Sequence, residues 1–395
     1  MAARTKIILR SGKDQSPKRF HPWIFSGAIK KMHGNPSEGD LVEVYSNKDE
    51  FLGLGHYSPG SIAVRIISFT PEHDISNILS GCIENAIKYR QKLGFLDNPK
   101  TNVFRLIHAE GDGLPGLIAD YYNGAVVLQF HSVGMYRMMD TVVGALKDSL
   151  GDRLRIIYTK SKSTLPFSFS PSLEDGYLLD GDRSNEVMEN GNRFLVDWEG
   201  GQKTGFFNDQ RENRKLLGSL STGRSVLNLF GYTGGFSVYA LQGGAGKVIT
   251  VDSSSSAVEM ARRNVEINFG QSIHHKAIDS DVFDYLAGTE ELFDIVVTDP
   301  PAFAKHLKVL NNAMQGYRRL NEKVLGNLKP GGILFTFSCS QVVSRENFRK
   351  AVMSAASNTG RKIRIMYQLS QPPDHPVNIY HPESEYLKGL VIQVD

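Results

Sequence analysis

The chain has 395 residues, which is too long for one ordinary hydrophobic core and suits two or three domains. Its 41% apolar and 22% charged residues are typical of a soluble globular protein. Its net charge of +3 indicates no class of partner, and its two cysteines cannot build a disulfide framework. The start of the chain lacks the apolar core of a signal peptide and no later run is long enough to span a bilayer, so the sequence predicts a cytoplasmic protein.

The first 31 residues are basic, with eight lysines and arginines against Asp14 alone. His21, Trp23 and Phe25 lie close to these charges in the sequence. Cationic and aromatic side chains together suit a nucleic acid, because the cations hold phosphates and the rings stack on bases. An ordinary solvated surface explains the same residues, and this segment alone does not decide between the two interpretations.

Residues 5–69 predict a small β domain. Short β-branched runs at 41–45 and 62–67 are separated by turns that contain glycine and proline. Isoleucines at helical spacing then predict a helix over 75–93.

The middle third of the chain predicts a second unit of strands and one helix. The dipeptide Asn123-Gly124 indicates a hairpin between two of the strands. The serine, proline and glycine content of 161–184 is that of a connection. The expected strands are 103–108, 117–122, 125–130 and 155–159, and the expected helix is 135–150.

From about residue 225 onward, strands alternate with helices. This alternation predicts an α/β fold with a parallel sheet and helices on both of its faces. The expected strands are 226–230, 247–252, 274–278, 294–299, 332–338, 363–369 and 387–394.

A glycine-rich turn, Phe230-Gly231-Tyr232-Thr233-Gly234, follows the first of these strands and leads into a helix. Glycines there let the backbone approach a ligand closely, and the helix N-terminus adds donors. Asp252 ends the next strand, where a carboxylate can accept hydrogen bonds from both hydroxyls of a ribose. Asp252 as a plain helix cap is the alternative, but the loop and the acid together favour a nucleoside site.

Asp281 follows the third strand, where an acidic side chain could reach the amino group of an adenine. This assignment is weaker than that of Asp252, because Asp279 and Asp284 are close competitors and each of these residues could be a cap.

Asp299-Pro300-Pro301 ends the fourth strand and Cys339 follows the fifth, at the edge where open α/β sheets bind ligands. The prolines stiffen the turn and fix the carboxylate, which could bond a planar base. A thiol at this edge suggests covalent chemistry, whereas a lone cysteine elsewhere is usually a small buried hydrophobe.

This order of motifs resembles the class I S-adenosylmethionine methyltransferases. More narrowly, nearly the whole chain resembles the ribosomal large-subunit cytosine-5 methyltransferase I family, which has an N-terminal PUA domain. The marks of the resemblance are Phe20-His21-Pro22-Trp23-Ile24-Phe25-Ser26-Gly27, Glu110-Gly111-Asp112-Gly113-Leu114-Pro115-Gly116-Leu117, Lys203-Thr204-Gly205-Phe206-Phe207-Asn208-Asp209-Gln210-Arg211, Phe337-Ser338-Cys339-Ser340, Asp374-His375-Pro376-Val377 and Tyr386-Leu387-Lys388-Gly389.

The resemblance implies a PUA-like β-barrel over 1–70, a central α/β domain over 71–188 and a Rossmann-like methyltransferase domain over 189–395. It implies S-adenosylmethionine as cofactor, no metal, and 23S ribosomal RNA or the assembling large subunit as partner, with a second copy of the chain as a further candidate partner and no membrane. Cys339 would be the nucleophile that attacks C6 of cytosine, and Asp299 would bind N3 of the base. The implied cofactor residues are Gln202, Lys203, Thr204, Gly205, Phe206, Phe207, Gln210, Arg211, Phe230, Gly231, Gly234, Asp252, Asp281 and Asp299, and the implied substrate residues are Pro300, Pro301, Phe303 and Arg214.

The chain departs from the family pattern at two places. Ala302 stands where many RNA cytosine-5 methyltransferases have a second cysteine, and Tyr121-Tyr122 replaces a more basic pair. Arg211 and Arg214 are candidates for holding RNA phosphates, and Lys305 and His306 are candidates for the base that removes the C5 proton. A guanine-N7 or amino-group methyltransferase and a noncatalytic RNA-binding assembly factor are the alternative functions.

Overall fold

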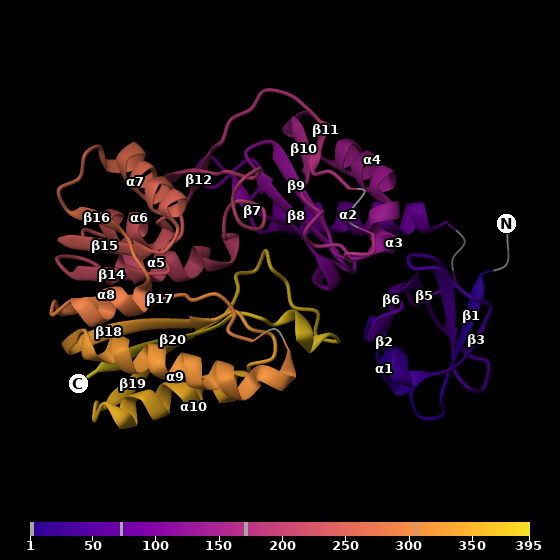
Figure 1. Cartoon of the computed structure of the whole chain (residues 1–395). Helices are drawn as coiled ribbons and strands as arrows, with labels where there is room; N and C mark the ends of the chain where they lie inside the picture. Colours follow the sequence, from indigo (N-terminus) through magenta and orange to yellow (C-terminus); the bar gives the residue numbers. More distant parts are fainter. Residues whose placement is uncertain (1–3, 72–73, 170–172, 305) are drawn as a thin grey trace. The chain divides into compact units, whose positions relative to one another are not determined.

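The computed structural model describes residues 4–71, 74–169, 173–304 and 306–395 (Figure 1). The chain forms two compact units that exchange short segments. The first unit consists of residues 1–187, 196–206 and 373–384, and the second of residues 188–195, 207–372 and 385–395. The three predicted domains differ from this division in number and stay a prediction. Among the described residues, no helix is both long enough and apolar enough to cross a membrane.

The N-terminal part of the first unit is a six-stranded sheet in the order β2-β6-β5-β4-β1-β3. Alternate residues of its strands point inward, so that Val42 and Val44 of β4 are fully buried beside Ile7 of β1. The predicted small β domain is thereby confirmed. Its elements are β1 (Thr5–Leu9), α1 (Gln15–Lys18), β2 (Trp23–Phe25), β3 (Ile29–His33), β4 (Leu41–Tyr45), β5 (Phe51–Tyr57) and β6 (Ile62–Ser68).

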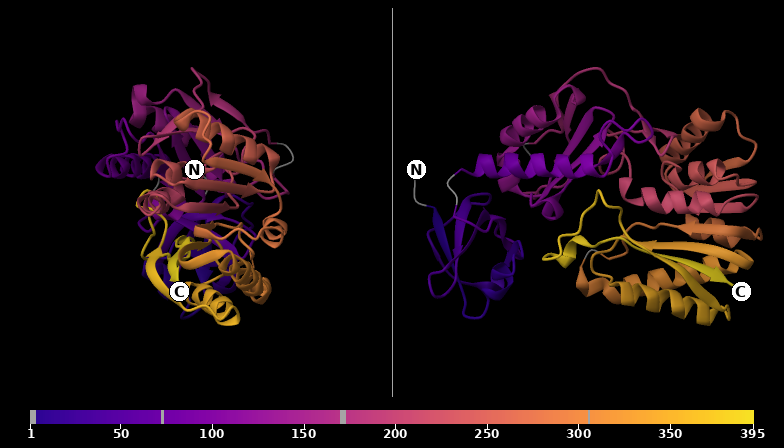
Figure 2. Two further views of the ribbon diagram at one scale, coloured as in Figure 1. Left: turned by 90° about the vertical axis from the view of Figure 1, so that its left-hand side faces the viewer. Right: turned by 180° about the vertical axis from the view of Figure 1, so that it is seen from behind.

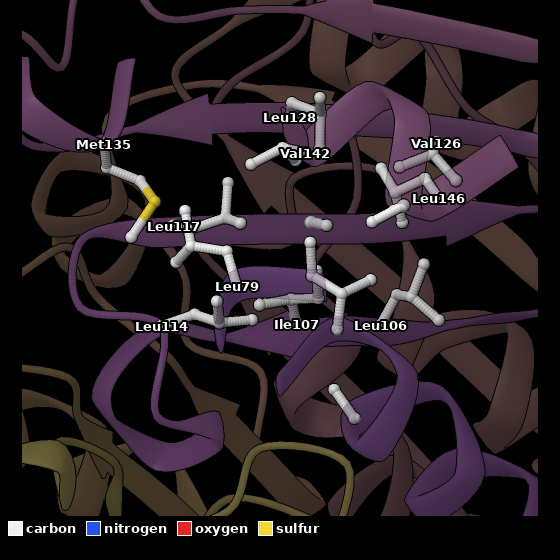
Figure 3. Packing of buried hydrophobic residues seen from close by; sticks show 14 of the residues in the cluster. Leu79, Leu106, Ile107, Leu114, Leu117, Val126, Leu128, Met135, Val142 and Leu146 are labelled. Atoms are coloured by element: carbon white, nitrogen blue, oxygen red, sulfur yellow. The ribbon is translucent and has the colours of Figure 1, made fainter. Parts of the chain in front are cut away.

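The central part of the first unit is a five-stranded sheet in the order β11-β10-β9-β8-β7. Figure 3 shows the buried side chains, among them Leu79 and Leu146, with which α2 and α4 pack against this sheet. The predicted hairpin is confirmed, because Asn123 and Gly124 join β8 to β9 with φ of 46° and 93°. The elements are α2 (Ile75–Lys92), β7 (Val103–His108), β8 (Leu117–Tyr122), β9 (Ala125–Phe130), α3 (Val133–Arg137), α4 (Met139–Leu150), β10 (Ile156–Thr159) and β11 (Gly176–Leu179).

Two expectations for this part of the chain were wrong. The helix predicted over 135–150 is two helices, because the backbone leaves helical geometry at Met138 (φ −93°, ψ 13°). The first helix also begins earlier than predicted, because Ser132 is its N-cap and the Ser132 hydroxyl accepts the amide of Met135. The predicted connection over 161–184 contains β11, which pairs antiparallel with β10.

The short segment 373–384 belongs to the first unit although it lies near the end of the chain. Asp374 is fully buried there, and its Oδ2 accepts the amide of Arg105 at 2.9 Å. The carbonyl of Asp374 accepts Nη2 of Arg90 at 2.6 Å, and the same buried guanidinium is paired with Asp112. These bonds fix the segment against α2 and β7.

The second unit is built on a seven-stranded sheet in the order β16-β15-β14-β17-β18-β20-β19. The first five strands in this order are parallel, as predicted, but β20 is antiparallel to both of its neighbours. The strands are β14 (Ser225–Leu229), β15 (Lys247–Asp252), β16 (His275–Asp279), β17 (Phe293–Thr298), β18 (Leu328–Ser338), β19 (Ile363–Leu369) and β20 (Lys388–Val394), and a separate two-stranded sheet is formed by β12 (Glu186–Glu189) and β13 (Asn192–Leu195).

Helices cover both faces of this sheet, as predicted, because successive strand residues point to opposite sides. Leu227 and Leu229 of β14 pack on the side of α8, α9 and α10, and Val226 packs on the side of α5 and α6. Figures 1 and 2 show α9 and α10 along one face of the sheet. The helices are α5 (Arg211–Ser219), α6 (Gly235–Gln242), α7 (Ser255–Phe269), α8 (Val282–Gly288), α9 (Leu310–Gly326) and α10 (Arg345–Asn358).

Candidate active site

The predicted site residues of the second unit follow the carboxyl ends of four adjacent strands. Leu229 of β14 is in register with Val251 of β15 and Thr298 of β17, and Thr298 is in register with Thr336 of β18. Because these strands are parallel, the glycine-rich turn, Asp252, Asp299 and Cys339 emerge at one edge of the sheet. The structure thus brings the four motifs together.

The glycine-rich turn is tightly wound against β15. Phe230 and Tyr232 have positive φ, and so does Gly234, which is the N-cap of α6 with φ of 77°. A Cβ atom on Gly231 would lie 2.4 Å from Cγ2 of Thr250, so only glycine fits that position. The backbone of the turn is therefore held close to the sheet, and its contact with a nucleoside stays a prediction.

Asp252 is bound to this turn directly. Its Oδ2 accepts the amide of Tyr232 at 2.9 Å, and its Oδ1 accepts the amide of Ser254 at 2.9 Å. The N-cap of α7 is Ser254, whose hydroxyl accepts the amide of Ala257, so Asp252 is not the cap. An ionised carboxylate has about four acceptor positions, so Asp252 can accept further hydrogen bonds, and its contact with a ribose stays a prediction.

Asp281 is the N-cap of α8. Its Oδ1 accepts the amides of Phe283 at 2.7 Å and Asp284 at 3.2 Å. This is the capping role that the sequence left open, and contact with an adenine stays a prediction.

Asp299 is half-buried at the end of β17 and belongs to a chain of side-chain hydrogen bonds. Its Oδ2 accepts Nε2 of Gln210 at 2.9 Å, and the Oε1 of Gln210 accepts Nδ2 of Asn213 at 2.6 Å. Burial, together with the charge of Asp209, raises the pKa of Asp299 to about 7, against the opposing effect of the Gln210 hydrogen bond. Near neutral pH this carboxyl can therefore be a hydrogen-bond donor as well as an acceptor.

Cys339 lies beside the Asp-Pro-Pro turn. Its half-buried Sγ is 3.9 Å from the carbonyl oxygen of Pro300. The next residue, Ser340, donates from its hydroxyl to the carbonyl of Ala304 at 2.6 Å, which ties the two loops together. Pro300 is buried and Pro301 is exposed, and their contact with a substrate stays a prediction.

Tyr317 of α9 lies beneath this pair of loops, and sequence reasoning missed it. Its hydroxyl accepts from Ser338 at 2.9 Å, and its ring centroid is 4.6 Å from that of Phe303. Burial raises the pKa of Tyr317 to about 12, so the phenol stays neutral at physiological pH. Phe303 is thereby packed from below by a rigid aromatic side chain.

The predicted cofactor segment 202–211 divides between the two units after Phe206. In the first unit, Thr204 donates to Oδ2 of Asp120 at 2.6 Å and accepts from the hydroxyl of Tyr122 at 3.0 Å. Buried there are Thr204, Gly205 and Phe206, whereas Gln202 and Lys203 are exposed. In the second unit, the ring of Phe207 contacts that of Tyr232 in the glycine-rich turn, at 5.2 Å between centroids.

The expected contacts of Arg214 and Arg211 with RNA phosphates need correction, since both side chains are buried. Nε and Nη2 of Arg214 donate to Oε1 and Oε2 of Glu189 at 2.9 and 2.7 Å, and Nη1 donates to the carbonyl of Phe207. The hydroxyl of Tyr239 also donates to Oε1 of Glu189, at 3.0 Å. Arg214 therefore holds the start of α5 inside the unit rather than a phosphate on its surface.

Two other residues gave no local signal in the sequence. Glu189 is paired with Arg214, which lies 25 residues further along the chain, and Asn213 donates to Gln210, which lies just before α5. Lys388, by contrast, lies in the quoted string Tyr386-Leu387-Lys388-Gly389, where a lysine at a buried strand position was a detectable anomaly. His306 is exposed, and Lys305 lies outside the described residues.

Known proteins resemble this chain in sequence and in fold. The family model of S-adenosylmethionine-dependent methyltransferases matches residues 173–386, and that of the PUA-like domain matches residues 7–69. The chain is 40% identical over 399 residues to the ribosomal RNA large subunit methyltransferase I of Pseudoalteromonas atlantica, covering 99% of each chain. A methyltransferase structure from Streptococcus mutans has a TM-score of 0.85 at 24% identity, over 98% of this chain and 99% of that one, and a methyltransferase in complex with S-adenosylhomocysteine gives the same values.

Proposed function

The chain belongs to the ribosomal RNA large subunit methyltransferase I family, and we propose that it methylates C5 of a cytosine in 23S ribosomal RNA. It is an enzyme that depends on S-adenosylmethionine. The observation that carries the cytosine-C5 proposal is the 3.9 Å approach of the Cys339 Sγ to the carbonyl of Pro300. A thiol beside an Asp-Pro-Pro turn suits attack on a pyrimidine ring, whereas methylation of an amino group or of guanine N7 needs no thiol.

The proposed reaction begins when the thiolate of Cys339 forms a bond to C6 of the flipped-out cytosine. The protonated carboxyl of Asp299, positioned by Gln210, donates a hydrogen bond to N3, where the ring accumulates charge. S-adenosylmethionine supplies the methyl group that becomes bonded to C5. Loss of the C5 proton to a base then restores the C5–C6 double bond, and the electron pair of the S–C6 bond returns to Cys339.

Binding of the RNA is assigned to the PUA-like domain as well as to the site. Phe20 and Phe25 are 51% and 46% exposed there, which is unusual for such large rings and suits stacking on bases. Exposed cations occur in the same stretch of the chain, namely Arg10, Lys13, Arg19, Lys30 and Lys31. The assembling large subunit as substrate, a second copy of the chain as partner and a cytoplasmic location stay predictions.

The test is a mechanism-based trap on RNA that carries 5-fluorocytosine at the target position. Fluorine cannot leave as a proton does, so the Cys339–C6 bond should persist as a covalent adduct after methyl transfer. Cys339→Ala should form no adduct and no 5-methylcytosine, read by bisulfite sequencing, while it still binds S-adenosylmethionine in calorimetry.

Cys82→Ala is the matched control. Cys82 lies in α2, where burial raises the pKa of its thiol, and it should be dispensable for both adduct and methylation. Normal methylation by Cys339→Ala would reject covalent catalysis in favour of a guanine-N7 or amino-group methyltransferase. Failure of the unmodified chain to bind S-adenosylmethionine would favour a noncatalytic assembly factor.

A further inference from the structure

Lys388 is a buried lysine next to the nucleophile. It is the first residue of β20, is 4% exposed, and lies directly opposite Ser338 in the β18–β20 register. Its Nζ donates to the carbonyl oxygen of Ser340. The amino group of Lys388 is therefore anchored to the backbone of the short stretch, Ser338 to Ser340, that carries Cys339.

Cys339 lies in the chain between the two groups that Lys388 meets, which are Ser338 in the strand register and the carbonyl of Ser340. Glu385 is the nearby carboxylate, but its Oε1 accepts Nε of Arg345 at 2.7 Å and is thereby committed to that guanidinium. Burial and the charge of Arg345 lower the pKa of Lys388 to about 8, and the thiolate of Cys339 and the carboxylate of Glu385 oppose this shift. A buried ammonium without a full counter-charge is unfavourable, so a stable fold alone gives no reason for a lysine here.

We propose that Lys388 is a positioning residue that deprotonates Cys339 and then holds its thiolate; this inference rests on the proposed function. In the proton transfer, the S–H bond of Cys339 breaks, its electron pair stays on Sγ, and a new N–H bond forms on the neutral amine of Lys388. The resulting ammonium stabilises the thiolate before it attacks C6 and again when C5 deprotonation expels it. Lysine is suited to this role because burial makes its pKa easy to shift.

In this proposal, a cavity of about 180 Å³ beside Lys388 is the route for proton exchange. It lies between α10 and the β19–β20 pair and is lined by residues that include Lys388, Arg345, Arg349 and Gln368. This volume accommodates several water molecules. The titratable groups near Lys388 are thus Cys339 and Glu385, together with Arg345, Glu346 and Arg349 of α10, while Tyr317 of α9 lies near Cys339.

The first experiment measures the reactivity of the Cys339 thiol in the absence of RNA. It uses the Cys82→Ala background, so that Cys339 is the one cysteine of the chain. The rate of alkylation by iodoacetamide is followed from pH 6 to 10 for the parent and for Lys388→Met, which keeps the length of the side chain and removes its charge. We expect the half-maximal pH to rise by about one unit, a roughly tenfold slower alkylation at pH 7. Lys388→Arg, which keeps the charge, should remain closer to the parent than Lys388→Met.

The matched control is Lys247→Met. Lys247 is exposed at the start of β15 and paired with Glu291, away from the cavity beside Lys388, so its loss removes a lysine and should leave the profile unchanged. Calorimetric binding of S-adenosylmethionine verifies that each variant is folded. An alkylation profile of Lys388→Met that matches the parent would overturn the inference.

The second experiment follows methyl transfer to RNA as a function of pH. Lys388→Met should lower kcat and leave KM for RNA unchanged, and the loss should shrink as pH rises, because hydroxide then forms the thiolate without help. An equal loss at every pH would indicate a structural role and would also overturn the inference. A methylating Cys339→Ala would reject the proposed function instead, while the alkylation profile would still report whether Lys388 and Cys339 are paired.

Discussion

Replacing Asp299 by asparagine should stabilise the second unit at pH 8 and change its stability little at pH 4. Burial, with the nearby charge of Asp209, raises the pKa of this carboxyl from 3.8 to about 7 in the folded protein. The unfolded chain keeps the ordinary value. Between pH 4 and 7 the unfolded state therefore loses a proton that the folded state retains, and the free energy of unfolding falls across that window. Asparagine has the same shape and does not titrate, so its stability does not fall there.

The size of the effect follows from the difference between the two pKa values. Each pKa unit corresponds to about 1.4 kcal/mol, so complete conversion of the shift would give about 4 kcal/mol above pH 7. Asp299 is only half-buried, and water weakens the interaction. We therefore expect a stabilisation of about 2 kcal/mol at pH 8, and the amide can still accept the hydrogen bond from Gln210.

The measurement should be hydrogen exchange of backbone amides in β17 and β18, read by mass spectrometry at several urea concentrations. Tryptophan fluorescence would report the wrong unit, because Trp23 and Trp198 both belong to the first one. A loss of stability in Asp299→Asn at both pH values would refute the assigned burial cost.

Asp294→Asn, at the other end of β17, is the control with the opposite sign. Burial alone would raise the pKa of Asp294, but hydrogen bonds from Ser225 and Lys329 outweigh burial and lower this pKa. This carboxylate contributes stability above the unfolded pKa and loses it as pH falls, so Asp294→Asn should destabilise the unit at pH 8 and much less at pH 3.

Two further predictions concern the cofactor site and the buried ion pair. Asp252→Ala should weaken S-adenosylmethionine binding by about 1–3 kcal/mol in calorimetry, the range for losing charged hydrogen bonds, and an unchanged Kd would remove Asp252 from the ribose site. Glu189→Ala should destabilise the second unit by about 3–5 kcal/mol, because the Arg214 charge stays buried without its partner. Tyr239→Phe leaves the ion pair in place but removes the hydroxyl that donates to Glu189 and accepts from Asn190, and it should cost about 1–2 kcal/mol, so losses equal to those of Glu189→Ala in urea unfolding would contradict this account.

The parts of the fold that sequence predicted well are those with local chemistry. The bounds of β7, β8 and β9 follow from the alternation of apolar runs with the Asn123-Gly124 turn, and the structure has the same bounds. The meeting of Asp252, Asp299 and Cys339 at one edge also followed, because parallel strands carry their carboxyl ends to the same side.

The parts that sequence could not predict depend on partners far along the chain. An arginine in an amphipathic helix reads as a surface cation, and nothing near Arg214 reveals that Glu189 will bury it. The break at Met138 likewise carries no glycine or proline to mark it. Asn213 orients Gln210 toward Asp299 only after α5 and β17 have been brought together.

The placement of segment 373–384 in the first unit has a consequence for how the protein is made. Translation proceeds from the N-terminus, so residues 1–187 leave the ribosome long before the segment that completes their unit. Until then, Arg105 has no Asp374 to receive its amide and Arg90 lacks one of its buried acceptors. A nascent chain stopped before residue 373 should therefore leave a surface beside α2 and β7 that only residues 373–384 can cover, so the first unit is completed only after most of the second has been synthesised.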